Sequence, residues 1–540
     1  MTTSDLRLAA PAAGCWVAAA LTLIVPAGWG AALAGVFTLA AATAGLYART
    51  VDGTARAIAV TSAAACGVIA ASALSVVLRI VAVEQAPIGS ADGKPVVDVD
   101  VRGDPSFTVG GRMRLPVTVR AIGGHRQRPV PATLMASADA ADPLPGERYR
   151  VRVRVRPPRA GAADRLQAAQ LTAVGEVQRL RGPPWWQAVA GRVRERLRDV
   201  AQRALPERPA GLLPGLVLGD VSGLDRQTSD DFRSAGLTHL IAVSGSNFTL
   251  VCGAVILGIR VSGASEPVVA VLGGAAIVGF VILVRPTDSV LRAAVMGSVG
   301  LAAGLGSRRS QALPALGTAV IVVLLLWPQM AVAPGFALSV VATLGLVIWS
   351  VPIRRALMRR GMPESVAMLL SMTLAAQVLT TPLLIVLTDT VNLMSVPANL
   401  LAVPVVGTAG LLGTAAAVIG AIGPQFGPGG VVAEFLVRAA GPPTRWLIVV
   451  ADRLGGPAWS TLSVPGWTVG SVFLVCLLGG LAWRRRGDVG GFWHHVRCER
   501  SAVSTTRRRR LPDRTRHLTG DGRAQPRRRG RRARHPGPRR

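Results

Sequence analysis

Long apolar stretches separated by short polar ones dominate the chain up to residue 486. Three come first and nine more follow a polar interval, at 12–26, 29–47, 57–83, 237–259, 267–284, 290–305, 312–327, 335–352, 365–387, 393–422, 431–450 and 466–483. A helix needs roughly 20 apolar residues to cross a bilayer. The pattern predicts a polytopic α-helical membrane protein of about twelve crossings, with re-entrant segments as the alternative for stretches broken by proline or glycine.

The polar interval between the third and fourth apolar stretches has a period of two from Pro95 to about Leu180. Five runs are predicted as strands, at 96–101, 113–122, 131–136, 149–155 and 171–177, with turns rich in glycine, proline and aspartate between them. Five short strands in under about 100 residues favour a small β-barrel, with the OB-fold as the leading candidate. Because arginines in alternate loops place both ends of the helical part in the cytoplasm, this domain is predicted to be extracytoplasmic.

One predicted strand alternates arginine with apolar residues. Its outer face would carry the guanidinium groups of Arg148, Arg150, Arg152, Arg154 and Arg156. Such a row can follow the phosphates of single-stranded DNA without reading bases. A merely solvated strand face is the alternative, because aromatic residues for base stacking are scarce in this domain.

A basic segment follows the strands. Residues 187–205 predict an amphipathic helix whose apolar stripe is Val189, Val193, Leu197 and Val200. With Trp185 and Trp186 before it, this helix is expected to lie among lipid headgroups. The alternative is a linker helix packed on the barrel.

Residues 211–250 then combine a short apolar run, an acidic polar turn and a return to apolar sequence. Polar groups at membrane depth are costly unless they face water or protein, so they favour a functional interpretation. The segment contains Leu218-Gly219-Asp220, Gly236-Leu237-Thr238-His239-Leu240 and Ala242-Val243-Ser244-Gly245. Further motifs follow, at Ser289-Val290-Leu291-Arg292-Ala293, Pro334-Gly335-Phe336-Ala337-Leu338-Ser339, Ala375-Ala376-Gln377 and Pro397-Ala398-Asn399-Leu400-Leu401-Ala402-Val403-Pro404.

In residues and order, these motifs resemble the competence domain of the ComEC family, multi-pass proteins that pass transforming DNA through the inner membrane. Where many members have Leu-His after the Ser-Gly pair, this chain has Ser246-Asn247. The resemblance implies an OB-like domain outside the membrane, a DNA channel within it, an external DNA receptor and a cytoplasmic ATPase. Membrane lipids are the other expected partners, and assembly of several copies is left open.

The predicted organisation has five parts. They are N-terminal transmembrane helices (1–84), an OB-fold-like soluble domain (85–182), an amphipathic interfacial helix (183–207), a competence-type multi-pass channel domain (208–486) and an arginine-rich disordered tail (487–540).

Polar residues within the apolar part are the candidates for a DNA path: Asp220, Asp231, His239, Ser244, Ser246, Asn247, Arg292, Gln377 and Asn399. Taken singly, interhelical hydrogen bonds are the alternative. The two aspartates would repel phosphate, so we expect them to pair with Arg226, with Arg233 or with a metal carried along with the strand. Arg285 and Arg292 flank Asp288 and form either a phosphate entry or a local ion pair.

No catalytic constellation, P-loop, cysteine pair or metal-ligand spacing is evident, so neither enzymatic activity nor a cofactor is expected. The net charge is +31 at pH 7, much of it in the tail. ComEC proteins often continue there into a metallo-β-lactamase-like domain with an HxHxDH motif, which this chain lacks. We therefore expect a truncated or frame-shifted end, with a natural short form as the alternative.

The sequence thus predicts an inner-membrane channel for single-stranded transforming DNA. Two alternatives remain, which are a secondary transporter or exporter of another anionic substrate and a remnant without function.

Overall fold

The computed structural model describes residues 7–108, 111–137, 143–241, 245–305, 312–421, 427–473 and 475. Met1–Phe473 form one compact unit, which holds every described residue except Val475. Its first helices are α1 (Ala9–Ile24), α2 (Ala27–Tyr47) and α3 (Gly53–Glu84), followed by the 3-10 turn η1 (Pro87–Ser90). Apolar residues of α1 and α3 pack with α11 and α12 around the fully buried Phe336.

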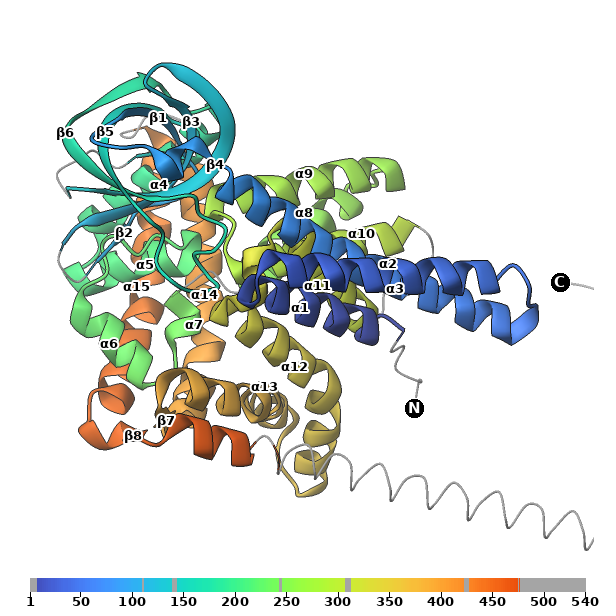
Figure 1. Cartoon of the computed structure of the whole chain (residues 1–540). Helices are drawn as coiled ribbons and strands as arrows, with labels where there is room; N and C mark the ends of the chain where they lie inside the picture. The colour runs from blue at the N-terminus through green and yellow to red at the C-terminus, as the bar shows by residue number, and fades with distance from the viewer. Residues whose placement is uncertain are drawn as a thin grey trace, which may run out of the picture. The chain divides into compact units, whose positions relative to one another are not determined.

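The strands after η1 form a single sheet (Figure 1). They are β1 (Val96–Val101), β2 (Ser106–Phe107), β3 (Met113–Ile122), β4 (His125–Ala136), β5 (Arg148–Arg156) and β6 (Gln170–Arg181). The order is β1-β5-β6-β4-β3-β2, and β1 also pairs with β3. The pairings of the five long strands therefore lead from β1 round to β1 again. The five predicted strands are confirmed, and the short β2 is an addition.

The alternation of side chains along a strand determines which residues fill the core of this sheet. Val97 and Val99 of β1, Val151 and Val153 of β5, and Leu171 of β6 are all fully or almost fully buried. Their neighbours along each strand point to the other face, because successive side chains alternate across a strand. The arginines of β5 are therefore on the outer face, as the sequence predicts.

The segment that the sequence singles out folds into three helices and the start of a fourth. They are α5 (Glu207–Leu218), α6 (Arg226–Ser234), α7 (Thr238–Ile241) and α8 (Gly245–Val261). Leu212 and Leu216 of α5 and Phe232 of α6 have no exposed surface. Asp225 begins α6 by accepting the backbone N–H of Thr228 at 2.8 Å, an ordinary N-terminal cap.

The remaining helices are α9 (Glu266–Val284), α10 (Asp288–Leu305), α11 (Ala312–Leu326), α12 (Pro334–Arg359), α13 (Glu364–Thr388), α14 (Ser395–Ala421) and α15 (Pro428–Gly455). Shorter elements are η2 (Pro328–Val332), β7 (Thr390–Asn392), η3 (Ala458–Ser460) and β8 (Thr461–Ser463). Among the described residues, six helical segments are long and apolar enough to cross a membrane: 27–47, 53–90, 266–284, 334–359, 364–388 and 395–421. Ala9–Ile24, Asn247–Val261 and Ala312–Leu326 are shorter apolar helices. The fold is that of a polytopic, mostly helical membrane protein.

The basic helix α4 (Trp185–Ala204) contacts several other helices. It packs against α5, α9, α14 and α15. Its apolar residues Val193, Leu197 and Val200 are buried in a core that also contains Phe248 and Phe280. Three residues of the predicted stripe thus face other helices, whereas Val189 and the preceding tryptophans are exposed. Helix α4 also contacts the sheet domain through Arg194 and Asp104, and its place among lipid headgroups stays a prediction.

Helices α12 and α13 approach closely at a glycine. A Cβ on Gly345 would lie 2.2 Å from the backbone oxygen of Ala375, so no side chain fits there. We predict that Gly345→Ala destabilises the protein by about 1–3 kcal/mol, because the two helices must separate. The thermal unfolding midpoint of the purified chain measures this loss.

Gly274 of α9 is the matched control, since a Cβ there would meet nothing within 4 Å. Gly274→Ala should leave the midpoint unchanged or raise it slightly, because alanine favours helix by up to about 1 kcal/mol. Equal midpoints for the two variants would contradict the close approach.

Candidate functional site

The arginine row on β5 is divided into two halves by the neighbouring strand. Arg148 Nε and Nη2 donate to Asp100 at 2.6 and 3.1 Å, and Arg150 donates to Asp98 at 2.8 and 3.0 Å. The antiparallel register of β1 and β5 places each aspartate directly opposite its arginine. This half of the row is already neutralised within the sheet.

Asp100 is held ionised by its surroundings. Burial alone would raise its pKa, but the hydrogen bonds and charges of Arg148 and Arg120 outweigh burial, and the pKa lies below its ordinary value. Arg120 Nε donates to the same carboxylate at 2.8 Å. Asp100 therefore neutralises Arg148 throughout the neutral pH range.

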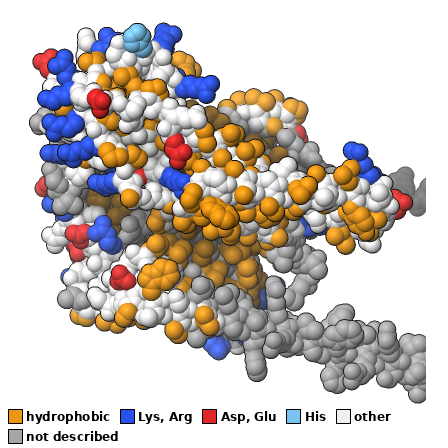
Figure 2. Space-filling view, viewed as in Figure 1, with side chains coloured by type: hydrophobic (Ala, Val, Ile, Leu, Met, Phe, Trp, Pro, Cys, Tyr) orange, Lys and Arg blue, Asp and Glu red, His pale blue; other side chains and the backbone are white. Residues whose placement is uncertain are grey.

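The second half of the row has no such partners. Strand β1 begins at Val96, opposite Arg152, so no β1 residue faces Arg154 or Arg156. All three side chains are exposed, and within the described part of the chain none is in an ion pair. Figure 2 shows Lys and Arg side chains gathered over the strand-bearing end of the view. Of the β5 row, Arg152, Arg154 and Arg156 thus remain available to an anion.

The two aromatic residues of the sheet domain, Phe107 and Tyr149, differ in how far their rings are exposed for base stacking. Phe107 on β2 is 59% exposed. Tyr149 is half-buried and donates its hydroxyl to Glu147, and burial and this carboxylate raise its pKa. Only Phe107 presents an open ring for stacking.

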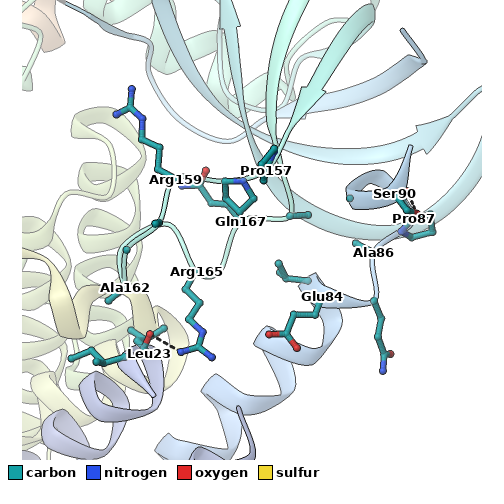
Figure 3. Close-up of a pocket in the computed structure, with 18 residues that line it drawn as sticks. Leu23, Glu84, Ala86, Pro87, Ser90, Pro157, Arg159, Ala162, Arg165 and Gln167 are labelled. Atoms are coloured by element: carbon teal, nitrogen blue, oxygen red, sulfur yellow. Dashed lines mark hydrogen bonds between the residues drawn. The ribbon is translucent and has the colours of Figure 1, made fainter. Parts of the chain in front are cut away.

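A cavity of about 930 Å³ follows the end of β5 (Figure 3). The loop from Pro157 to Ala168 and the ends of α1 and α3 line it. Arg165 points towards the end of α1, where its Nη1 donates to the carbonyl of Leu23 at 3.1 Å and to that of Val25. Glu84 extends from the end of α3. The cavity therefore lies where the sheet domain meets the first helices.

Arginines of α4 satisfy the carbonyl ends of three other helices. Arg194 Nη1 donates to Leu218 O of α5 at 2.8 Å and to Leu283 O of α9 at 3.3 Å. Arg196 donates to Gly420 O and Ala421 O of α14 at 2.9 and 3.1 Å. The last carbonyls of a helix lack partners within the helix and carry partial negative charge, so a guanidinium group stabilises them.

One carboxylate of the sheet domain binds arginines of the helical part. Asp104, in the loop between β1 and β2, accepts Arg194 Nη2 at 3.0 Å and pairs with Arg285 Nε at 2.9 Å. Both arginines are more than nine-tenths buried. Arg285 also holds a backbone φ of 75°, which is rare for any residue except glycine. Arg285 is thus neither a phosphate entry nor the ion-pair partner of Asp288.

The acidic candidates Asp220 and Asp231 have structural partners. Asp220, 5% exposed, accepts Arg198 at 2.6 Å and the hydroxyl of Ser222 at 2.6 Å. Asp231 lies 3.8 Å from Arg208, whose guanidinium also pairs with Asp452. These partners are not Arg226 or Arg233, the two considered from the sequence; Arg233 pairs with Asp230.

Asn247 and Arg292 lie where several helices meet. Asn247 is buried, and its Nδ2 donates to Leu216 O of α5 at 2.7 Å. Arg292 Nε on α10 donates to Ser339 Oγ on α12 at 2.8 Å. Gly245 lies close to Arg292, since a Cβ on it would be 3.1 Å from Arg292 Nη2. Ser244 and the side chain of Ser246 lie outside the described residues, and His239 is exposed on α7.

Gln377 and Asn399 form a second polar cluster. Gln377 Nε2 of α13 donates to Ser395 Oγ at the start of α14, and Asn399 Nδ2 donates to Ser395 O at 2.7 Å. The Gln377 bond joins two helices, as in the alternative that the sequence offered, whereas the Asn399 bond lies within α14. Gln377 and Asn399 thus share Ser395 as a partner, whereas Asn247 bonds to Leu216 and Arg292 to Ser339.

Sequence reasoning missed Arg194, Arg196, Asp104 and Asp452. A local signal existed for the first two, since arginine on the polar side of a helix beside long apolar helices is well suited to bind their carbonyl ends. No local signal marked the aspartates, whose partners lie far away in the chain.

The spans, the inserted sheet and the buried polar residues define a multi-pass membrane protein with an inserted β-sheet domain. The family model described as "Competence protein" matches residues 216–487, and the chain belongs to this family. The chain is also similar to "ComE operon protein 3" of Bacillus subtilis (strain 168), with 28% identity over 213 residues, which is 39% of this chain and 26% of that protein. No solved structure matches. The resemblance noted from the sequence motifs is confirmed.

We predict that Asp104→Asn destabilises the protein by about 2–4 kcal/mol, because it leaves two buried arginines without their carboxylate. The thermal midpoint should fall, and trypsin should cleave the sheet domain faster. Asp230→Asn is the control, since both members of its ion pair with Arg233 are more than 60% exposed. A midpoint that falls equally in both variants would argue against the role of Asp104.

Proposed function

We propose that this protein is an inner-membrane channel that passes single-stranded DNA into the cytoplasm during natural competence. The observation that carries the proposal is the competence-family match over residues 216–487, a range that includes Asn247 and Arg292. A role in competence DNA uptake follows from the family. The strand state, the channel and the inner-membrane location are our proposal, since the chain covers only 26% of the curated relative.

We infer that the β domain is an OB-fold-like barrel that receives the strand. The inference is supported by the pairing of five long strands, which returns from β3 to β1, and by the single parallel pair, β4 with β6. OB-folds are small five-stranded barrels that bind oligonucleotides. The exposed Arg152, Arg154 and Arg156 would attract phosphates electrostatically, and the open ring of Phe107 offers a stacking surface for a base.

Within the membrane, a strand needs polar groups that neither repel it nor hold it permanently. Asn247 and Arg292 supply such groups in the family domain. The proposal assigns the chain no catalytic step. The driving force would come from a cytoplasmic ATPase, and an external receptor would supply DNA to the β domain.

Uptake of labelled DNA tests the channel. Cells without this gene should lose cytoplasmic uptake, and the wild-type gene should restore it. We predict that Asn247→Leu restores uptake at least about tenfold less well, because the carbonyl of Leu216 loses its donor at a cost of about 1–3 kcal/mol. Thr249→Val, in the same helix but exposed, should restore uptake fully. Normal uptake in cells that lack the gene would reject the channel.

DNA binding by the full chain in lipid nanodiscs tests the arginine surface. Replacing Arg152, Arg154 and Arg156 by Gln should weaken binding of a labelled oligothymidylate about tenfold or more. The slope of log affinity against log salt should fall by about 2, since each phosphate contact to a single strand contributes roughly 0.7.

The control replaces Arg148 and Arg150 by Gln. Because Asp100 and Asp98 already neutralise these two, the salt slope should hardly change. An equal change of slope in both variants would contradict the division of the row.

A further inference from the structure

Arg292 differs from the other deeply buried arginines. It is 9% exposed, and its contacts are Ser339 Oγ at 2.8 Å and Met296 Sδ at 3.5 Å. Across the described residues no carboxylate lies within ion-pair distance of it. Arg194 and Arg285 are buried to a similar degree, but both pair with Asp104.

The nearest acidic residue along the helix does not pair with Arg292. Asp288 lies one turn before Arg292 on α10, but among the described residues the two side chains form no ion pair. A Cβ on Gly335 would lie 2.5 Å from its Oδ2, which shows how closely this carboxylate approaches the start of α12. Asp288 thus lies against the start of α12 and does not compensate the charge of Arg292.

An uncompensated guanidinium at this depth is costly, because arginine does not lose its proton in proteins and a buried charge needs a partner. Such residues in membrane proteins mark substrate and ion paths. The cost is removed if an anion occupies the position during the working cycle.

The surroundings of Arg292 favour an anion. Its Nη2 lies against Gly245, the first residue of α8, so closely that a Cβ there would be 3.1 Å away. Helix α8 has 17 residues, and its first backbone N–H groups carry partial positive charge. A buried guanidinium and a helix N-terminus that meet at a glycine form the usual elements of a phosphate site.

We propose that Arg292 and the N-terminus of α8 bind a phosphodiester monoanion inside the membrane domain. The inference rests on the proposed function, in which the diester is one backbone unit of the passing strand. A phospholipid headgroup has the same chemistry. The strand is favoured because α10 packs against α8, α9, α11 and α12, so other helices flank the site.

Dimethyl phosphate is a suitable probe, since it carries one diester charge and is small enough to enter. Binding to the full chain in phosphatidylcholine nanodiscs is measured by the shift of the thermal midpoint with probe concentration, against sodium chloride of equal ionic strength. The wild type should show a saturable shift. Arg292→Met should bind about 10- to 100-fold more weakly, because it lacks the charged donor. Wild-type affinity in this variant would overturn the site.

Stability without the probe separates this role from a structural one. Arg292→Met should keep or raise the midpoint, because it removes an uncompensated buried charge. Arg194→Met, at nearly equal burial, should lower it, because Asp104 loses a partner. If the Arg292 variant falls as far as the Arg194 variant, the guanidinium is structural and the proposal fails.

Arg292→Lys keeps the charge but not the planar group, so it provides a test even if the methionine variant does not fold. It should bind the probe roughly tenfold more weakly than the wild type; unchanged affinity would count against a guanidinium contact.

Two further arms identify the source of the diester. A tetrathymidylate that displaces dimethyl phosphate supports the strand. A probe shift that disappears in nanodiscs containing phosphatidylglycerol, with no competition by the tetranucleotide, overturns the strand in favour of a lipid. Probe binding without DNA uptake in cells would reject the channel and keep the anion site, whereas uptake without probe binding would reject the site alone.

Discussion

Backbone carbonyls at helix ends need donors, and in a bilayer water does not supply them. Here guanidinium groups do so from outside the helices. Arg194 and Arg196 of α4 bind the ends of α5, α9 and α14, and Arg165 of the sheet domain binds the end of α1. Arg79 binds the end of α11 through Leu326 O at 2.9 Å. These donors hold the membrane helices in register, and the buried polar residues depend on that register for their positions.

Carboxylates decide which arginines remain available in a chain so rich in this residue. On the sheet, Asp98 and Asp100 neutralise one half of the β5 row and leave the other half open. Arg194 and Arg285 of the helical part share the carboxylate of Asp104, whereas Arg292 has no ion-pair partner among the described residues. The net charge of +31 therefore says little about where an anion can bind. The distribution of a few aspartates is more informative.

The elements could be predicted from the sequence because their signals are local. Apolar length predicted about twelve crossings, of which six described helical segments are long and apolar enough to cross a membrane, and period-two alternation predicted the five long strands. The partners could not be predicted, because they lie far apart in the chain. Arg196 and Ala421 are separated by 225 residues, and the aspartates of β1 meet the arginines of β5 only through the strand register. The apolar stripe of α4 indicated burial correctly but not the surface that buries it, since helices and headgroups demand the same side chains.

The sheet domain is attached to the helices at two separate places, by Asp104 to Arg194 and Arg285 and by Arg165 to the end of α1. The two attachments act in parallel when a load is applied to the sheet. A force that pulls on the sheet is therefore shared between them. A polymer drawn past it would therefore slide against a fixed rim, and the work done on the polymer would be spent on its movement rather than on bending the protein.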